Sequence, residues 1–117
     1  MIKRATAIAV TVTLAGAAPA AAHVGVKSFS PKRNSTVSRS LERVKVTFKG
    51  RVTDGRLTVR DADGDKVSIG EGRLVSRDRV LRVRLRDGLS RGRYRASMSV
   101  LHTDGHVMNK SWNFNLN

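Results

Sequence analysis

The chain alternates apolar and polar side chains with the two-residue period of β-strands that are buried on one face. In residues 41–48, Val44, Val46 and Phe48 fall on the same face. Residues 80–88 place three apolar side chains on one face and three arginines on the other, namely Leu81, Val83 and Leu85 against Arg82, Arg84 and Arg86. We expect the apolar faces to form a core and the arginines to face water or a polyanion.

The same pattern predicts further strands at residues 24–29, 56–61, 66–70, 92–102 and 107–116. Asp-Gly pairs are strong hairpin signals. One lies between residues 56–61 and 66–70, and another between residues 92–102 and 107–116. No convincing helical stretch follows the first 22 residues. The sequence therefore predicts an all-β fold, a single Greek-key, immunoglobulin-like β-sandwich or barrel of about seven strands.

The first 22 residues have the composition of a cleavable signal peptide. Lys3 and Arg4 precede an apolar stretch that is too short to cross a bilayer, and Ala20 to Ala22 form a small-residue cleavage site. We expect residues 1–22 to be removed, with His23 as the first mature residue. The mature chain, residues 23–117, is predicted to be a monomeric domain in the periplasm with no stable membrane insertion.

The charge is strongly positive, with 23 Lys and Arg against 9 Asp and Glu and a net charge of +14. Without Lys3 and Arg4 it is 21 − 9 = +12. Such a charge favours polyanions. The basic residues are spread along the chain, however, and the chain has one Trp, one Tyr and three Phe, so we expect no nucleic-acid partner. The absence of cysteine excludes disulfides and thiolate metal sites.

The three histidines suggest a metal site. His102 and His106 lie in the segment HTDGH, and cleavage after Ala22 would expose the α-amino group of His23. That amine and the His23 ring can chelate one ion, while His106 adds a nitrogen and Asp104 an anionic oxygen. Such a set suits tetragonal Cu(II), with zinc as the main competitor. Taken alone, Asp104-Gly105 is more often a hairpin turn with an idle histidine beside it.

The segment Tyr94 to Leu116 resembles the end of the CopC family of exported copper-binding proteins. In that family a mature N-terminal histidine accompanies the pattern Tyr-x-Val-x-Trp-x-Val-x-Ser-x-Asp-Gly-His and a last strand ending in Phe-x-Val. The residues in register are Tyr94, Val100, Asp104, Gly105, His106 and Phe114. Residues 28–52 are similar to the family's Ser-Pro segment and the strand that follows it. The resemblance covers nearly the whole mature chain.

The resemblance implies one Cu(II) ion per chain, bound by His23 through its amine and ring, by Asp104 and by His106. It implies a protein that buffers or carries copper for resistance or homeostasis, with a membrane importer or another copper carrier as a possible partner. The departures from the family pattern are Ala96, Met98, His102 and Lys110, where Val, Trp, Ser and Gly are usual, and the segment FKGRV. They leave open the packing around the site and any partner surface.

Three neighbouring features qualify this interpretation. We expect His102 to be a partly exposed substitution near the site, with a role as an alternative or supporting ligand left open. Met98 and Met108 do not form a Met-x-x-Met cluster, so we expect no dedicated Cu(I) site. Asp61, Asp63 and Asp65 alternate as calcium ligands do, but the EF-hand glycine and glutamate are missing, so we expect a turn.

Two other function classes remain as alternatives. One is a basic β-sandwich that binds a polyanion or serves in adhesion, with incidental histidines. The other is a histidine-brace copper oxygenase. Asp104 argues against the enzyme, because a carboxylate bound to copper fills the position that oxygen or substrate would need. We therefore predict a binding protein and no enzyme.

Overall fold

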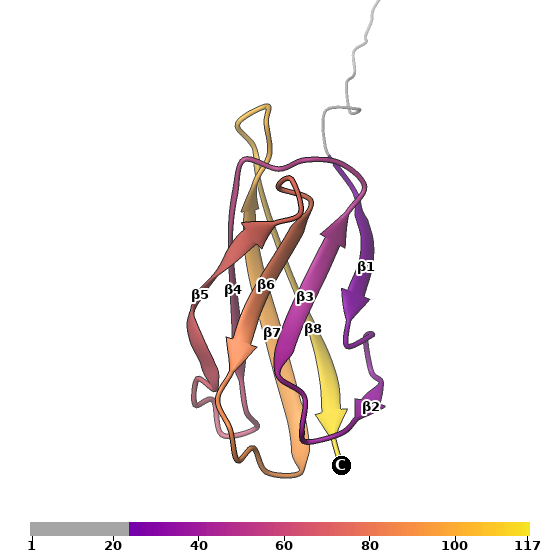
Figure 1. The fold of residues 1–117 in the computed structure, drawn as a ribbon, viewed down its shortest axis with the longest axis vertical. Coiled ribbons are helices and arrows are strands. Elements are labelled where there is room, and N and C mark those ends of the chain that lie inside the picture. The colour runs from indigo at the N-terminus through magenta and orange to yellow at the C-terminus, as the bar shows by residue number, and fades with distance from the viewer. Residues whose placement is uncertain (1–23) are drawn as a thin grey trace, which may run out of the picture.

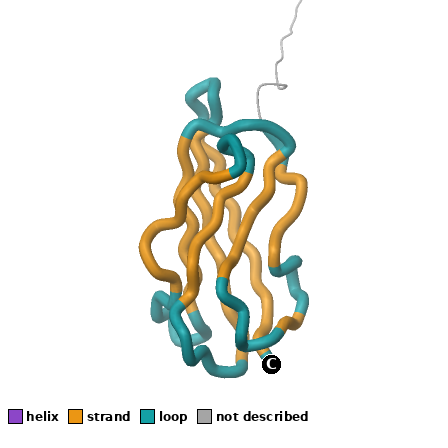
Figure 2. Tube along the Cα trace, viewed as in Figure 1, coloured by secondary structure: helices purple, strands orange, loops and turns teal. Residues whose placement is uncertain are grey.

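The computed structural model describes residues 24–117, which form eight strands and no helix (Figures 1 and 2). The strands are β1 (Val26–Ser30), β2 (Thr36–Val37), β3 (Arg43–Phe48), β4 (Asp54–Arg60), β5 (Ser68–Val75), β6 (Val80–Leu85), β7 (Gly92–Leu101) and β8 (Val107–Leu116). The strand missed by the sequence pattern is β2, which has only two residues and pairs in parallel with the end of β8.

The strands form two four-stranded sheets, in the orders β1-β3-β6-β5 and β2-β8-β7-β4. The two sheets pack as a sandwich, which confirms the predicted fold class. Only β5–β6 and β7–β8 are hairpins between consecutive strands, and every other connection crosses from one sheet to the other. No helix of the described residues is long and apolar enough to cross a membrane.

The core lies between the sheets and follows the predicted alternation. Val44, Val46 and Phe48 of β3 are buried. In β6 the predicted apolar face is also buried, while Arg84 on the other face is exposed and Arg82 half-buried. Burial of these side chains supplies the main driving force for the fold, because apolar surface is removed from water.

Trp112 of β8 connects the second sheet to the β1–β2 segment. Its Nε1–H donates to the carbonyl of Pro31 at 2.9 Å, and its ring centroid lies 4.5 Å from that of Phe29. Ala96 of β7 lies directly opposite Trp112, so the smallest core side chain faces a large one. This pairing offers a packing reason for the alanine at a position where a valine was expected from the resemblance.

The two Asp-Gly pairs have different outcomes. Asp104-Gly105 lies in the hairpin between β7 and β8, which are paired over their whole length, as predicted. At Asp63-Gly64 the predicted reversal of the chain is present, but the pairing of its two arms is short and does not continue within one sheet. There the chain turns and forms a single bridge, Arg60 to Lys66, and then enters the opposite sheet as β5.

Candidate metal centre

Residues 102–106 form the loop of the β7–β8 hairpin, at one end of the sandwich (Figure 1). Two backbone hydrogen bonds close the loop: the His102 N–H donates to the His106 carbonyl at 2.8 Å, and the Gly105 N–H donates to the His102 carbonyl at 3.0 Å. Gly105 has φ +91°, a left-handed conformation that suits glycine. The sequence Asp-Gly-His thus forms a tight turn at the end of two long strands.

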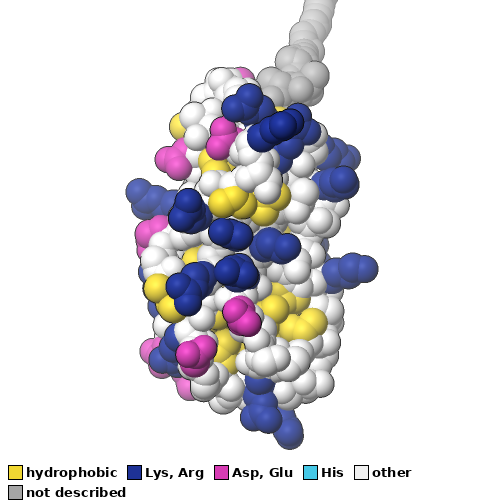
Figure 3. Space-filling view, in the orientation of Figure 1, with side chains coloured by type: hydrophobic (Ala, Val, Ile, Leu, Met, Phe, Trp, Pro, Cys, Tyr) yellow, Lys and Arg dark blue, Asp and Glu magenta, His cyan; other side chains and the backbone are white. Residues whose placement is uncertain are grey.

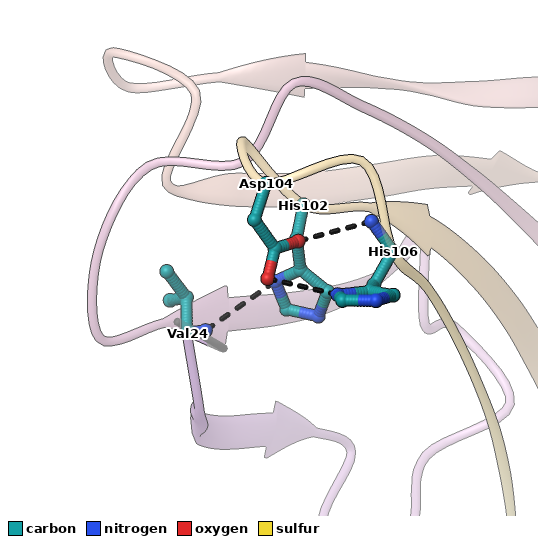
Figure 4. Close-up of polar contacts among 4 residues, drawn as sticks. All are labelled: Val24, His102, Asp104 and His106. Atoms are coloured by element: carbon teal, nitrogen blue, oxygen red, sulfur yellow. Dashed lines mark hydrogen bonds and ion pairs between the residues drawn. The ribbon is translucent and has the colours of Figure 1, made fainter. Parts of the chain in front are cut away.

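The turn brings Asp104 and His106 into direct contact (Figure 4). One carboxylate oxygen, Oδ1, accepts the backbone N–H of His106 at 2.9 Å, and Oδ2 lies 3.0 Å from Nδ1 of the His106 ring. The His106 side chain is 69% exposed and that of Asp104 21%. An anionic oxygen and an imidazole are therefore held side by side at the surface, where a metal ion could reach them.

The carboxylate can act on a metal in two ways. It can bind the ion itself, as the sequence predicts. It can also orient the His106 ring through Nδ1, in the way that metal-binding histidines are commonly held while the other ring nitrogen binds the ion. Both arrangements need Asp104 in its observed place.

His102 is buried, with 1% of its surface exposed, so the prediction of a partly exposed residue is wrong. The reason is the period of β7, whose inward side chains are Tyr94, Ala96, Met98 and Val100, all of them buried. His102 continues this series by one more step of two residues. The same alternation that predicted the strand was therefore the signal that His102 is buried.

The His102 ring contacts the start of the described chain. Its Nδ1 accepts the backbone N–H of Val24 at 3.3 Å, across 78 positions of sequence (Figure 4). The N–H of Lys49 donates to the carbonyl of Gly25 at 2.8 Å, and the Val24 side chain packs against the core. The first described residues are thus fixed beside the hairpin loop.

The structure brings together two of the three predicted metal ligands, Asp104 and His106, and places His102 beside Val24. The third predicted ligand, His23, and the predicted signal peptide lie outside the described residues. Val24, the residue that follows His23 in the sequence, lies at the loop.

A second group of acidic side chains lies in the turn after β4. Carboxylate oxygens of Asp61, Asp63 and Asp65 come within 4.8 Å of one another. Oδ1 of Asp61 accepts the backbone N–H groups of Asp63 at 3.0 Å and Asp65 at 2.9 Å. Asp61 therefore stabilises the turn itself, in agreement with the turn predicted here.

The fold matches known copper proteins. The structure of CopC from Methylosinus trichosporium OB3b is similar to this chain with a TM-score of 0.68 and 25% sequence identity, over 81% of this chain and 94% of that one. PcoC, a methionine-rich copper resistance protein from Escherichia coli, matches with a TM-score of 0.66 and 20% identity, over 82% and 100% of the two chains. The second match supports the fold alone.

Sequence comparison gives the family. No match is found among curated proteins. The family model described as the CopC domain matches residues 26–117, which include every strand and the Asp104–His106 turn. The chain therefore belongs to the CopC family.

Proposed function

We propose that this protein binds one Cu(II) ion outside the cytoplasmic membrane and buffers or carries it for copper resistance or homeostasis. Cleavage after Ala22 would leave His23 at the N-terminus. The ligands would be the amine and ring of His23, the carboxylate of Asp104 and the ring of His106. Copper is the cargo of this protein and takes part in no reaction there.

The observation that carries the proposal is the contact between Asp104 and His106 beside the start of the described chain. The carboxylate lies 3.0 Å from the His106 ring, and the N–H of Val24 donates to the His102 ring in the same loop. One imidazole and one carboxylate alone make a weak site. Nitrogens from the residue before Val24 would complete a set of three nitrogens and an oxygen, which suits Cu(II).

Membership of the CopC family supports copper as the metal and binding as the activity. The similar structures are those of a CopC protein and of a copper resistance protein. This membership supports a copper-binding protein over an oxygenase. Periplasmic location, the Cu(II) state and one ion per chain are part of the proposal.

The experiment tests the amine of His23 as a ligand. The exported protein is purified as cells release it, its N-terminus is determined by mass spectrometry, and Cu(II) affinity is measured against a competing chelator. A variant that keeps one extra residue before His23 converts the amine into an amide. We expect this extension to weaken Cu(II) binding by at least about 100-fold, because two ligands of one chelate ring are affected.

The matched control carries one extra residue after Asn117, which lies beyond β8 at the opposite end of the sandwich from the 102–106 loop (Figure 1). Its affinity should equal that of the unmodified protein. Equal affinity in both extended proteins would show that the amine is not a ligand. A mature N-terminus other than His23 would also contradict the proposed ligand set.

A further inference from the structure

The outer face of the β1-β3-β6-β5 sheet carries basic side chains in two rows. Strand register places Lys45 opposite Arg82 and Arg82 opposite Arg73 in one row, and Arg43 opposite Arg84 in the next. Of these five, only Arg82 is half-buried and the others are exposed. Figure 3 shows Lys and Arg side chains gathered across the middle of this face. We call these five residues the arginine face.

This arrangement costs stability in the isolated protein. Like charges directly opposite each other on neighbouring strands repel and destabilise the pairing. One carboxylate that lines this part of the sheet, Glu71 of β5, is engaged with Lys66, whose Nζ lies 2.7 Å from Oε2. This hydrogen bond and the charge of Lys66 hold the pKa of Glu71 below its usual value. Glu71 therefore offsets little of the positive charge of the arginine face.

The four arginines of this face line a hollow in the sheet. Strand register shifts in β5 between Ile69 and Arg73, where Gly70 and Gly72 both have positive φ and no side chain. A cavity of about 220 Å³ opens at this irregularity. Its lining includes the arginines of the face, Arg43, Arg73, Arg82 and Arg84, together with Glu71. Planar guanidinium groups bind phosphate oxygens in pairs, so a phosphate group fits this hollow by charge and geometry.

An apolar side chain lies beside the hollow. Ile69 is 53% exposed and is the cross-strand partner of Arg84. A purely polyanionic polymer would gain nothing from it, whereas the boundary between headgroups and acyl chains of a bilayer would accept it. A broad, basic sheet face with an apolar side chain at its edge matches a membrane surface better than it matches a soluble anion.

The aromatic side chains argue against single-stranded nucleic acid. Such ligands are bound by stacking of bases on exposed aromatic rings. Among residues 24–117, Phe48, Tyr94, Trp112 and Phe114 are buried in the core, and Phe29 packs on Trp112. The arginine face therefore offers charge without a stacking surface.

We propose that the arginine face binds the surface of anionic phospholipid bilayers, with a headgroup phosphate in the hollow at Gly70–Gly72 and Ile69 at the level of the headgroups. The binding is peripheral, since no helix in residues 24–117 could cross a membrane. In this binding mode the β1-β3-β6-β5 sheet lies against the bilayer. The proposed membrane binding does not depend on copper, so it can be tested independently of the proposed metal site.

The test is sedimentation of the copper-free exported protein with vesicles of equal parts phosphatidylglycerol and phosphatidylcholine, and with vesicles of phosphatidylcholine alone. Mass spectrometry first confirms that residues 1–22 are absent, because their apolar stretch could itself bind lipid. We expect binding to the anionic vesicles only. The triple variant Arg73→Gln, Arg82→Gln, Arg84→Gln should lose at least about ten-fold in lipid affinity, given about five-fold for each cation held near an anionic surface.

The matched control is Arg39→Gln, Arg91→Gln, Arg93→Gln, which removes the same charge from exposed positions away from the arginine face. It should lose less than about three-fold, because distant charges are screened. Thermal unfolding confirms that each variant folds, and removal of like-charge neighbours should not lower the stability of the first variant. An equal loss in both variants, or no binding of the unmodified protein, would overturn the proposal. Tighter binding of polyphosphate or single-stranded DNA than of vesicles would overturn the assignment to lipid.

Discussion

His102 shows how one residue can connect distant parts of this chain. Its ring is buried because it continues the inward side of β7, and its Nδ1 accepts the N–H of Val24. An imidazole can accept there only while that nitrogen carries no proton. The residue next to the predicted ligand His23 is therefore fixed by a histidine that belongs to the same loop as Asp104 and His106. We assign His102 a positioning role.

The first prediction concerns this role. His102→Ala removes the acceptor of the Val24 N–H and leaves a cavity at the end of the sandwich. We expect a loss of about 1–3 kcal/mol in the free energy of unfolding. Cu(II) affinity should fall by about ten-fold, as for residues that orient metal ligands. His102→Asn keeps a polar group that can accept a hydrogen bond and should recover part of the Cu(II) affinity.

Urea unfolding and Cu(II) titration against a chelator measure the two effects. Val107→Ala is the control, since Val107 is 58% exposed beside the same loop and should change neither quantity appreciably. Unchanged stability in His102→Ala would contradict the buried, hydrogen-bonded role. Complete loss of copper binding, with no recovery in His102→Asn, would indicate that His102 is itself a ligand.

At the scale of elements, local sequence signals predicted where the strands are better than which strands pair with each other. The alternation in β3, β6, β7 and β8 was sufficient to find these strands and their buried faces. The same Asp-Gly signal gave a hairpin at residue 104 but a crossing between sheets at residue 63. After the turn at residue 63, the N–H of Val67 still donates to the carbonyl of Val59, as in a hairpin. The N–H of Val59, however, donates to the side-chain hydroxyl of Ser68 and not to a backbone carbonyl. The chain then leaves β4 and pairs with β6.

Contacts between distant residues explain the remaining differences. Strand β2 consists of two residues and exists through its pairing with the end of β8, about 80 positions away, so no local pattern marks it. The contact of His102 with Val24 likewise depends on where the sandwich places the first strand. The turn holding Asp104 and His106, in contrast, is encoded by three consecutive residues and was predictable.

Gly72 provides a prediction at the scale of strand packing. It has φ +84°, and an added Cβ would lie 3.1 Å from the Arg82 carbonyl oxygen and 3.2 Å from the backbone nitrogen of Leu57. A methyl group here would force the backbone of β6 or β4 to move by a few tenths of an ångström. Gly72→Ala should lower the free energy of unfolding by about 3 kcal/mol, from the left-handed conformation and the collision with backbone together.

Gly70 is the matched control, because it has φ +77° but no atom within 4 Å of an added Cβ. Gly70→Ala should cost only the conformational penalty, about 1 kcal/mol. Differential scanning calorimetry distinguishes the two, since each kcal/mol shifts the Tm by about 4–8 °C in a domain of this size. Equal shifts would show that β5 can move away from β4 without loss.

At the scale of the whole molecule, the two proposed surfaces lie apart. The 102–106 loop is at one end of the sandwich, while the arginine face lies across the middle of the outer side of the β1-β3-β6-β5 sheet (Figures 1 and 3). Copper would therefore remain accessible at the end of a domain whose side rests on a membrane. The two interactions also differ in physical origin, since one depends on nitrogen ligands and the other on charge.

The last prediction uses this difference. Amine and imidazole nitrogens bind metal only when deprotonated, and such groups in unperturbed form take up protons between about pH 8 and 6. Copper binding should release protons, and the apparent Cu(II) affinity should fall by more than about one decade per unit as the pH decreases from 7 to 5. Salt should change the Cu(II) affinity little, because at physiological ionic strength charges are screened beyond about 8 Å.

Binding to anionic vesicles should show the reverse behaviour. The vesicle affinity should decrease strongly as salt is added and change little over this pH range, because the arginines of the face stay charged throughout. Chelator competition and vesicle sedimentation at low and high salt, each measured from pH 5 to 8, separate the two. A pH-independent Cu(II) affinity would contradict a site built from an amine and two imidazoles, and a salt-independent vesicle affinity would contradict binding by charge at the arginine face.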